Sequence, residues 1–187
     1  MSDKLYIEAI LPFEQLCGLV LEEDLAAVAG FRKQQRKEEF LMWRAVVYRH
    51  LPGAEIRYNS VGAPVVCNFP VHLGVSHCPG YVAVALSDRP CAVDIESLSR
   101  NFDRIASRFA SRRELSLDGG EYLLPALWCG KEALYKYSGR QQLDWIRDLR
   151  IESLDMQRGR MTGRIADEAP VVIDVRIERN ICIAAIF

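Results

Sequence analysis

The amino-acid sequence predicts an α+β fold of two similar lobes, each a small, mostly antiparallel sheet packed on helices. Two observations predict it. The 187-residue chain passes twice from helix-like to strand-like segments, and its strand-like runs are short and separated by Gly, Pro, Asn and Asp. No direct repeat relates the halves. A chain of this length suits one domain or two small lobes, and we place the boundary so that the lobes are residues 1–90 and 91–187.

The first half contains a long helix between groups of strands. A strand-like run at residues 4–11 and a short helix at 21–30 come first. The long helix covers about residues 33–51, because its apolar residues recur every three or four positions, and Pro52 and Gly53 end it. The apolar stripe consists of Phe40, Trp43, Val47 and Leu51. Strand-like runs then follow at residues 54–59, 63–68, 72–77, 81–87 and 91–96.

The second half follows the same broad order. Residues 101–117 predict a helix or a broken helix, with Asn101 as its cap. A longer helix is expected from about Pro125 to Gly139, because Pro is favoured in a first turn and Gly just beyond the last. Four strand-like runs follow at residues 148–155, 159–167, 170–178 and 180–187.

Composition argues against several classes of partner. The net charge is −1, so no strong overall field attracts nucleic acid or membrane surfaces. No apolar run approaches the ~20 residues that span a bilayer, and the first residues do not resemble a signal peptide. We therefore expect a cytoplasmic protein with no nucleic-acid or membrane partner. The six cysteines lack metal-knuckle spacing, and three histidines are too few for a histidine-rich metal site.

Two carboxylates stand close together in the segment Ala92–Arg100. Asp94 and Glu96 are two residues apart in a strand-like run, so they share one face while Val93 and Ile95 point to the other. Such a pair suits a hard cation such as Mg²⁺, which takes oxygen ligands. It equally suits a strand end that runs into solvent, and the pair alone leaves both interpretations open.

Two further segments carry candidate functional residues. In "WCGKEALYK", Trp128–Lys136, helix geometry places Glu132 and Lys136 four apart on one face, with Lys131 beside them. Alone, this is typical of a surface Glu–Lys pair, worth only ~0.3–0.5 kcal/mol. Ser76 and His77 end a strand before a turn at Pro79 and Gly80, which would leave His77 partly exposed.

In this order, the three segments resemble the signatures of the 4′-phosphopantetheinyl transferase superfamily. Those signatures are Ser-His, then Gly-Val/Ile-Asp-Val/Ile-Glu, then Trp-x-x-Lys-Glu-Ala-x-x-x-Lys. Here they read Ser76-His77, Ala92–Glu96 and Trp128–Lys136, with two residues between Ala133 and Lys136 instead of three. Weaker similarity lies in "RIASRFASRREL", in "RKEEFLMWR" and in "GAP". The resemblance covers residues 32–154, and the length is nearer the monomeric, surfactin-synthetase-activating type.

The resemblance implies a fold, a reaction and a partner. It implies two lobes related by pseudo-twofold symmetry, with the active site at their interface. The 4′-phosphopantetheine arm of coenzyme A would pass to a serine of an acyl or peptidyl carrier protein, in fatty acid or secondary metabolite biosynthesis, and 3′,5′-ADP would leave. The enzyme would use Mg²⁺, with Mn²⁺ as an alternative, and would act as a monomer. The N-terminal lobe would bind coenzyme A, and the C-terminal lobe would carry the metal and catalytic motifs.

The resemblance also implies roles for individual residues. Asp94, Glu96 and Glu132 would hold the metal, while Glu132, as the base, and Lys136 would be catalytic. The coenzyme A ligands would be Arg36, Arg44, Ser76, His77, Lys131 and Lys136. Two departures stand out: Ala92 replaces a glycine, and Ala63 replaces a lysine that would meet a coenzyme A phosphate.

Arginines four apart could form a docking surface for the carrier. In a helix, Arg104, Arg108 and Arg112 would make one basic stripe, which Arg100 would extend. A solvated helix face explains them equally well. Two other functions share the same residues: a non-catalytic module that binds coenzyme A or a carrier protein, and a Mg²⁺-dependent phosphohydrolase.

Overall fold

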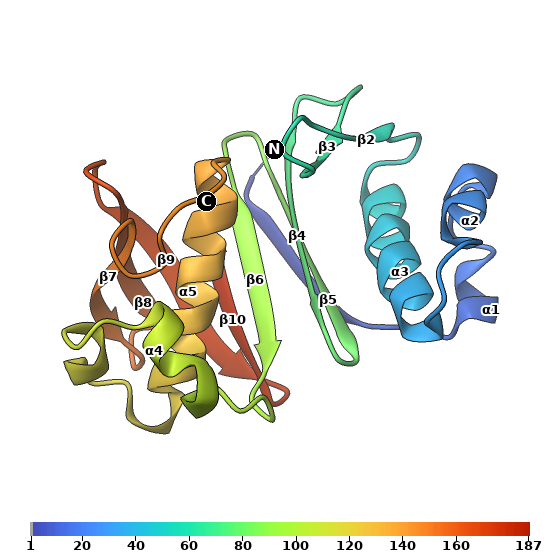
Figure 1. Ribbon diagram of the computed structural model, residues 1–187. Coiled ribbons are helices and arrows are strands. Elements are labelled where there is room, and N and C mark those ends of the chain that lie inside the picture. The colour runs from blue at the N-terminus through green and yellow to red at the C-terminus, as the bar shows by residue number, and fades with distance from the viewer. Residues whose placement is uncertain (1) are drawn as a thin grey trace. The chain divides into compact units, whose positions relative to one another are not determined.

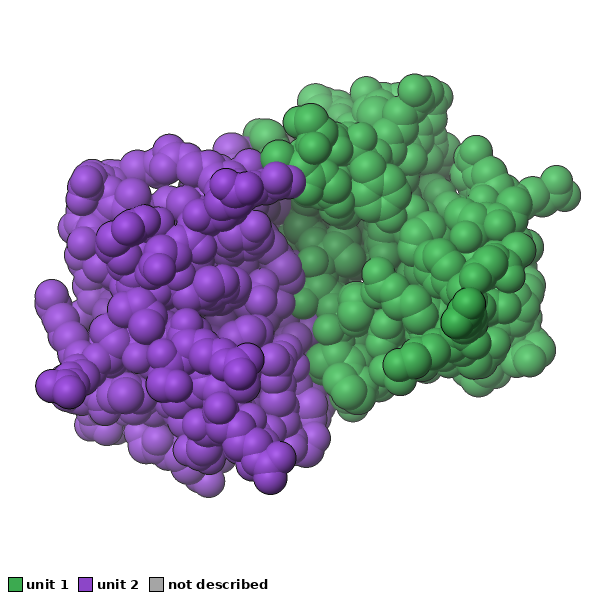
Figure 2. Space-filling model, viewed as in Figure 1, with its two compact units in different colours: residues 1–88 green, residues 89–187 purple. Residues whose placement is uncertain are grey.

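The computed structural model describes residues 2–187, and its chain forms two compact units, residues 1–88 and 89–187 (Figures 1 and 2). Antiparallel sheets and helices build both units, so the predicted α+β class is confirmed. The functional roles of the two lobes and the symmetry between them remain predictions. No helix within residues 2–187 combines the length and the apolar character that a membrane span requires.

The first unit joins a three-stranded antiparallel sheet to a group of helices. Its sheet has the order β1-β5-β4, and a separate pair, β2-β3, forms a hairpin. The strands are β1 (Lys4–Ala9), β2 (Ile56–Tyr58), β3 (Pro64–Val66), β4 (His72–Cys78) and β5 (Tyr81–Ser87). The helices are α1 (Phe13–Leu16), α2 (Glu22–Val28) and α3 (Gln34–His50).

Helix α3 supplies much of the core of this unit. Its boundaries match the prediction to within one residue at each end. Trp43 and Val47 of the predicted stripe are buried, and the helix packs against the apolar strand β5. Leu41, Met42 and Val46 are buried as well, so the predicted stripe is only part of the buried surface of this helix.

The second unit is a five-stranded antiparallel sheet with one long helix packed on it (Figure 1). The strand order is β6-β10-β9-β8-β7. The strands are β6 (Ala92–Ser97), β7 (Leu149–Asp155), β8 (Arg160–Ile165), β9 (Val171–Glu178) and β10 (Ile181–Ile186). The long helix is α5 (Leu123–Ser138), and the short helical turns are η1 (Asp103–Ile105), α4 (Ala106–Phe109), η2 (Glu114–Ser116) and η3 (Gly120–Tyr122).

The two units share one pairing pattern. In each, the strand that comes first in the chain pairs with the strand that comes last. In the first unit β1 pairs antiparallel with β5, and in the second β6 pairs antiparallel with β10. Pairing partners are therefore far apart in sequence: Asp94 lies opposite Ala184. Strand β6, which carries Asp94 and Glu96, is therefore held in the sheet by β10, the last strand of the chain.

Helix α5 approaches the sheet closely at a glycine. A Cβ added at Gly130 would lie 2.4 Å from the Sδ atom of Met161 on β8, so any larger residue would require a shift. The helix ends at Gly139, whose φ of 61° is the left-handed conformation that glycine adopts readily. It begins at Leu123, two residues before the expected Pro125.

The segment 101–117 is a broken helix, the second of the two predicted forms. It contains η1, α4 and η2, and residues 110–113 are not helical. Asn101 caps the first turn as expected, because its Oδ1 atom accepts a hydrogen bond from the Arg104 backbone, at 3.4 Å. Since Arg112 lies within the break, the predicted three-arginine stripe on one helix is wrong.

Candidate functional site

Strand β6 and helix α5 bring two of the predicted motifs together in the second unit. Asp94 and Glu96 share one face of β6, with side chains 7% and 18% exposed. From α5, the Lys136 ammonium forms an ion pair with Asp94, at 2.7 Å between Nζ and Oδ1, and also donates to the Val93 carbonyl at 3.1 Å. Lys136, which lies on α5, is thus bound directly to an acid on β6.

Glu132 lies one turn before Lys136 and shares the same electrostatic environment. Burial raises the pKa of the Glu132 carboxyl to about 7, and the charges of Asp94 and Glu96 act in the same direction. Lys136 and Arg100 oppose them. A carboxyl with a pKa near neutrality can both take up and release a proton under physiological conditions.

Arg100 contacts both Glu96 and the aromatic ring of Trp128. Its guanidinium forms an ion pair with Glu96 and lies 4.3 Å from the centre of the Trp128 ring, a cation–π contact. Burial raises the pKa of Glu96, and Asp94 adds to this, whereas Arg100 lowers it. Trp128 in turn stacks on Trp145, with ring centres 5.4 Å apart. The acids therefore have two cations and an aromatic wall around them.

The donors of this cluster suit a hard cation, although they do not form a ready-made cage. Within residues 2–187, no three His, Cys, Asp or Glu side chains are grouped so that they could hold a metal ion. The charge of Asp94 nevertheless raises the pKa values of Glu96 and Glu132, and the charge of Glu96 also raises that of Glu132, as acids that share one site do. Mg²⁺ often takes only one or two protein carboxylates and completes its shell with water and phosphate. The donor chemistry thus fits Mg²⁺ or Mn²⁺.

A second cluster lies in the first unit and contains two of the expected coenzyme A ligands. The Arg36 Nη1 atom lies 2.7 Å from His77 Nε2, joining helix α3 to strand β4. Beneath them lies Glu39, whose side chain is 8% exposed. Its Oε2 atom is 3.4 Å from His77 Nδ1 and 3.6 Å from Arg36 Nη1.

A comparison with protein families assigns the second unit. The family model described as the 4′-phosphopantetheinyl transferase superfamily matches residues 90–184, just over half of the chain. The chain belongs to this superfamily. The match contains β6 and α5, and thus Asp94, Glu96, Glu132 and Lys136. No curated protein matches the chain in a sequence search.

Two residues that the superfamily resemblance assigned to coenzyme A are instead buried in ion pairs. Arg44 is 4% exposed; its Nε atom lies 2.9 Å from Asp24 Oδ1, and its Nη2 donates to the Tyr58 hydroxyl at 2.8 Å. Its guanidinium also stacks on Phe40, 3.4 Å from the ring centre. These contacts give Arg44 a structural role, so we no longer propose it as a coenzyme A ligand.

Lys131 requires the same correction for the same reason. It is fully buried, its Nζ atom lies 2.8 Å from Glu114 Oε1, and it donates to the carbonyls of Phe109 and Trp145. A phosphate cannot reach an ammonium group in this position. Burial lowers the pKa of Lys131, and the hydrogen bond and charge of Glu114 oppose this shift.

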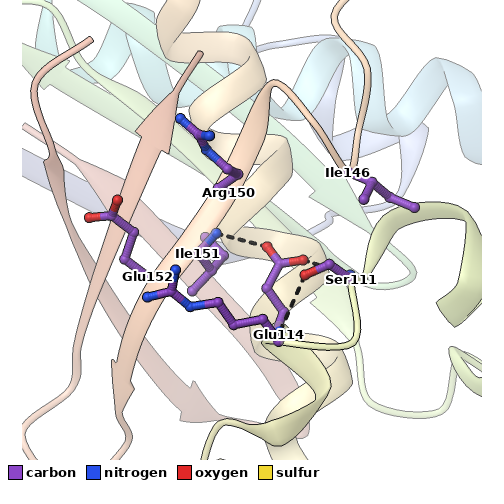
Figure 3. A pocket seen from close by; sticks show the side chains of 7 residues that line it. Ser111, Glu114, Ile146, Arg150, Ile151 and Glu152 are labelled. Atoms are coloured by element: carbon purple, nitrogen blue, oxygen red, sulfur yellow. Dashed lines mark hydrogen bonds between the residues drawn. The ribbon is translucent and has the colours of Figure 1, made fainter. Parts of the chain in front are cut away.

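Glu114 joins several segments around this lysine and was missed by the sequence analysis. It is 2% exposed and accepts hydrogen bonds from the backbone of Ser111, at 2.7 Å, and of Ile151, at 2.8 Å. A pocket of about 190 Å³ lies beside it (Figure 3). The pocket is lined by Ser111, Arg113, Glu114, Ile146, Arg150, Ile151 and Glu152, none of them a predicted site residue.

Ser76 and the three arginines expected to dock the carrier lie in β4 and around the broken helix. Ser76 is buried and alternates with His77 along β4, so the two side chains point to opposite faces. Arg104 lies in η1 and Arg108 in α4, which follows η1 directly, and Arg100 pairs with Glu96. A docking role for these arginines remains a prediction.

Proposed function

We propose that this member of the superfamily transfers the 4′-phosphopantetheine arm of coenzyme A to a serine of an acyl or peptidyl carrier protein. One observation carries the proposal: β6 and α5 gather Asp94, Glu96, Glu132 and Lys136 within the segment that the family model matches. A module that only binds coenzyme A has no need of three acids and a lysine on two elements that pack together.

The transfer exchanges one phosphorus–oxygen bond for another. The serine oxygen of the carrier forms a bond to the β-phosphorus of coenzyme A, and the bond from that phosphorus to the departing 3′,5′-ADP breaks. The serine proton must go to a base, and our candidate is Glu132, or a water that it holds, because its carboxylate lies beside the charges of Asp94 and Lys136. The products are the modified carrier and 3′,5′-ADP.

The other residues would bind and orient charged groups. Lys136, already bound to Asp94, would place positive charge beside the diphosphate, while Arg36 and His77 would hold an anionic end of coenzyme A. Asp94, Glu96 and Glu132 would hold Mg²⁺, or Mn²⁺ in its place, and this ion would neutralise charge on the diphosphate oxygens. We propose that the protein works as a monomer in the cytoplasm.

One assay tests the proposal against its alternatives. The protein is incubated with coenzyme A, Mg²⁺ and an apo carrier protein, and the carrier is weighed by mass spectrometry. We expect the carrier to gain one phosphopantetheine. Bound coenzyme A without this gain would favour a binding module, and free 3′,5′-ADP with an unmodified carrier would favour a phosphohydrolase.

A further inference from the structure

The carboxylate of Glu39 lies beneath two residues that are accessible to a ligand. Its side chain is 8% exposed, whereas those of Arg36 and His77 are 52% and 36% exposed. Glu39 is also held in place from its own helix, because Gln35 donates to its Oε1 atom at 2.8 Å. An anion from solvent can therefore reach the arginine and the histidine, while the carboxylate stays covered by them.

The contact between Arg36 and His77 determines which ring nitrogen of the histidine carries the proton. A guanidinium has only donors, so His77 Nε2, 2.7 Å from Arg36 Nη1, must be the accepting nitrogen. In the neutral ring the proton then lies on Nδ1, which faces Glu39 Oε2 at 3.4 Å. The carboxylate thus favours one tautomer and one orientation of the ring.

The burial of Glu39 needs an explanation beyond helix stability. An exposed Glu–Arg pair on a helix is worth only ~0.3–0.5 kcal/mol and requires no buried carboxylate. Removing a carboxylate from water costs free energy unless charges and hydrogen bonds compensate. Here the compensation comes from Gln35, Arg36 and His77, so the carboxylate and its two exposed partners form one unit.

We propose that Glu39 is a positioning residue, which holds the His77 ring and the Arg36 guanidinium in place to receive one anionic group of coenzyme A. When that group arrives, Arg36 can turn from Nε2 and donate to the anion, and Nε2 can then take up a proton from solvent and donate as well. Glu39 keeps the ring in place through Nδ1. Only the identity of the ligand rests on the proposed function.

The first test measures the ring itself and needs no transfer activity. The chain has three histidines, so ¹⁵N-histidine labelling gives a simple spectrum in which His77→Asn assigns the His77 signals. At a pH where the ring is neutral, we expect a protonated Nδ1 in the parent protein and in Glu39→Gln, whose amide oxygen still accepts. Glu39→Ala should show a mixture of tautomers, because Arg36 also loses its ion pair with Glu39 and no longer stays on Nε2. A proton on Nε2 in the parent protein would overturn the proposal.

The second test separates binding from chemistry. Glu39→Ala should raise the KM for coenzyme A by roughly tenfold, the effect of losing ~1.5 kcal/mol of positioning, and leave kcat within about twofold. Glu39→Gln should have a smaller effect. The matched control is Glu38→Gln, because Glu38 contacts Gln34 and the Phe13 backbone instead of His77.

The outcomes distinguish this proposal from the proposed function. If Glu39→Ala is folded but keeps the parental tautomer, or changes KM no more than Glu38→Gln does, Glu39 has no positioning role. If the parent protein transfers nothing, the transferase proposal fails, while the ring spectra and calorimetric binding of coenzyme A still decide the role of Glu39.

Discussion

Glu132 and Asp94 show how neighbouring carboxylates are held in different electrostatic states. Asp94 is bound directly by Lys136, whereas Glu132 is affected by Lys136 only as a nearby charge. Burial and two neighbouring acids therefore dominate at Glu132, and its pKa rises to about 7. A buried carboxyl whose pKa is raised toward neutrality is typical of sites that move protons.

Loss of either carboxylate should abolish transfer without unfolding the protein. We expect Asp94→Asn and Glu132→Gln to remove phosphopantetheine transfer to below a hundredth of the parental rate, because general-base catalysis alone contributes roughly 10²–10⁴-fold. Mass spectrometry of the carrier measures the rate, and circular dichroism checks the fold. Asp174→Asn on β9 is the control, since that carboxylate is half exposed and pairs only with Arg160 among its described contacts. Near-normal turnover in either variant would remove that residue from the site.

Glu132→Gln should also stabilise the metal-free protein at alkaline pH. The folded pKa of about 7 lies above the unfolded value, so this group contributes stability below about pH 4.5 that is lost as the pH rises through 7. Glutamine cannot ionise and avoids this loss. We expect a gain of about 1–3 kcal/mol at pH 8 and little gain at pH 4.5. Urea unfolding at both pH values measures it, and a gain equal at both would contradict the assignment.

At the scale of elements, the Lys131–Glu114 pair joins α5 to the turn at η2 and to β7. Both partners are buried, and removing one leaves the other charged and unpaired. Lys131→Met should therefore lower the free energy of unfolding by about 3–5 kcal/mol. In Lys131→Met/Glu114→Gln the loss should be smaller, because the amide oxygen still accepts from the Ile151 backbone. Denaturant unfolding of the single and double variants measures this coupling.

The same variants also test the corrected role of Lys131. A residue with no access to coenzyme A should not change its KM while the protein remains folded. A KM raised tenfold or more in a folded Lys131→Met variant would restore Lys131 as a phosphate ligand.

The hairpin β2-β3 should accept the lysine that the resembling family carries at position 63. Ala63 is exposed, and its backbone is held by Asn59: Ala63 N donates to Asn59 Oδ1 at 2.9 Å, and Asn59 N donates to Ala63 O at 3.0 Å. A longer side chain leaves these bonds intact. Ala63→Lys should lower the KM for coenzyme A by roughly tenfold, with kcat within about twofold. Dephospho-coenzyme A should show no gain, and an equal gain would place this residue away from the 3′-phosphate.

Local patterns predicted the elements well, whereas burial and pairing depended on contacts distant in sequence. Helices α3 and α5 follow from apolar spacing and from Pro and Gly at their ends. The adjacency of Lys131 and Glu132 does not reveal that one is enclosed by Glu114, seventeen residues away, while the other lies beside Asp94. Glu39 had a signal, an acid between the apolar positions of α3, but its partner His77 lies on another element.

At the scale of the whole molecule, each unit depends on pairing between its two end strands. In the second unit β10 lies between β6 and β9, so its loss would separate β6 from the rest of the sheet. Deleting residues 181–187 should therefore abolish the cooperative unfolding of this unit and all transfer, while deletion of the last residue alone should have little effect. Limited proteolysis and thermal unfolding measure the result. Retained cooperative unfolding would show that β6 is held by α5 alone.

The pairing of β6 with β10 also determines when the second unit can fold during synthesis on the ribosome. Ser97 ends β6 and Ile181 begins β10, so 83 residues separate the two strands. At 5–20 residues per second, the nascent β6 waits roughly 4–17 s for its partner. During that time an apolar strand with an open edge is prone to aggregate. Asp94 and Glu96 place two charges on one face of this strand, so the carboxylates proposed for catalysis would also keep the unfinished chain in solution.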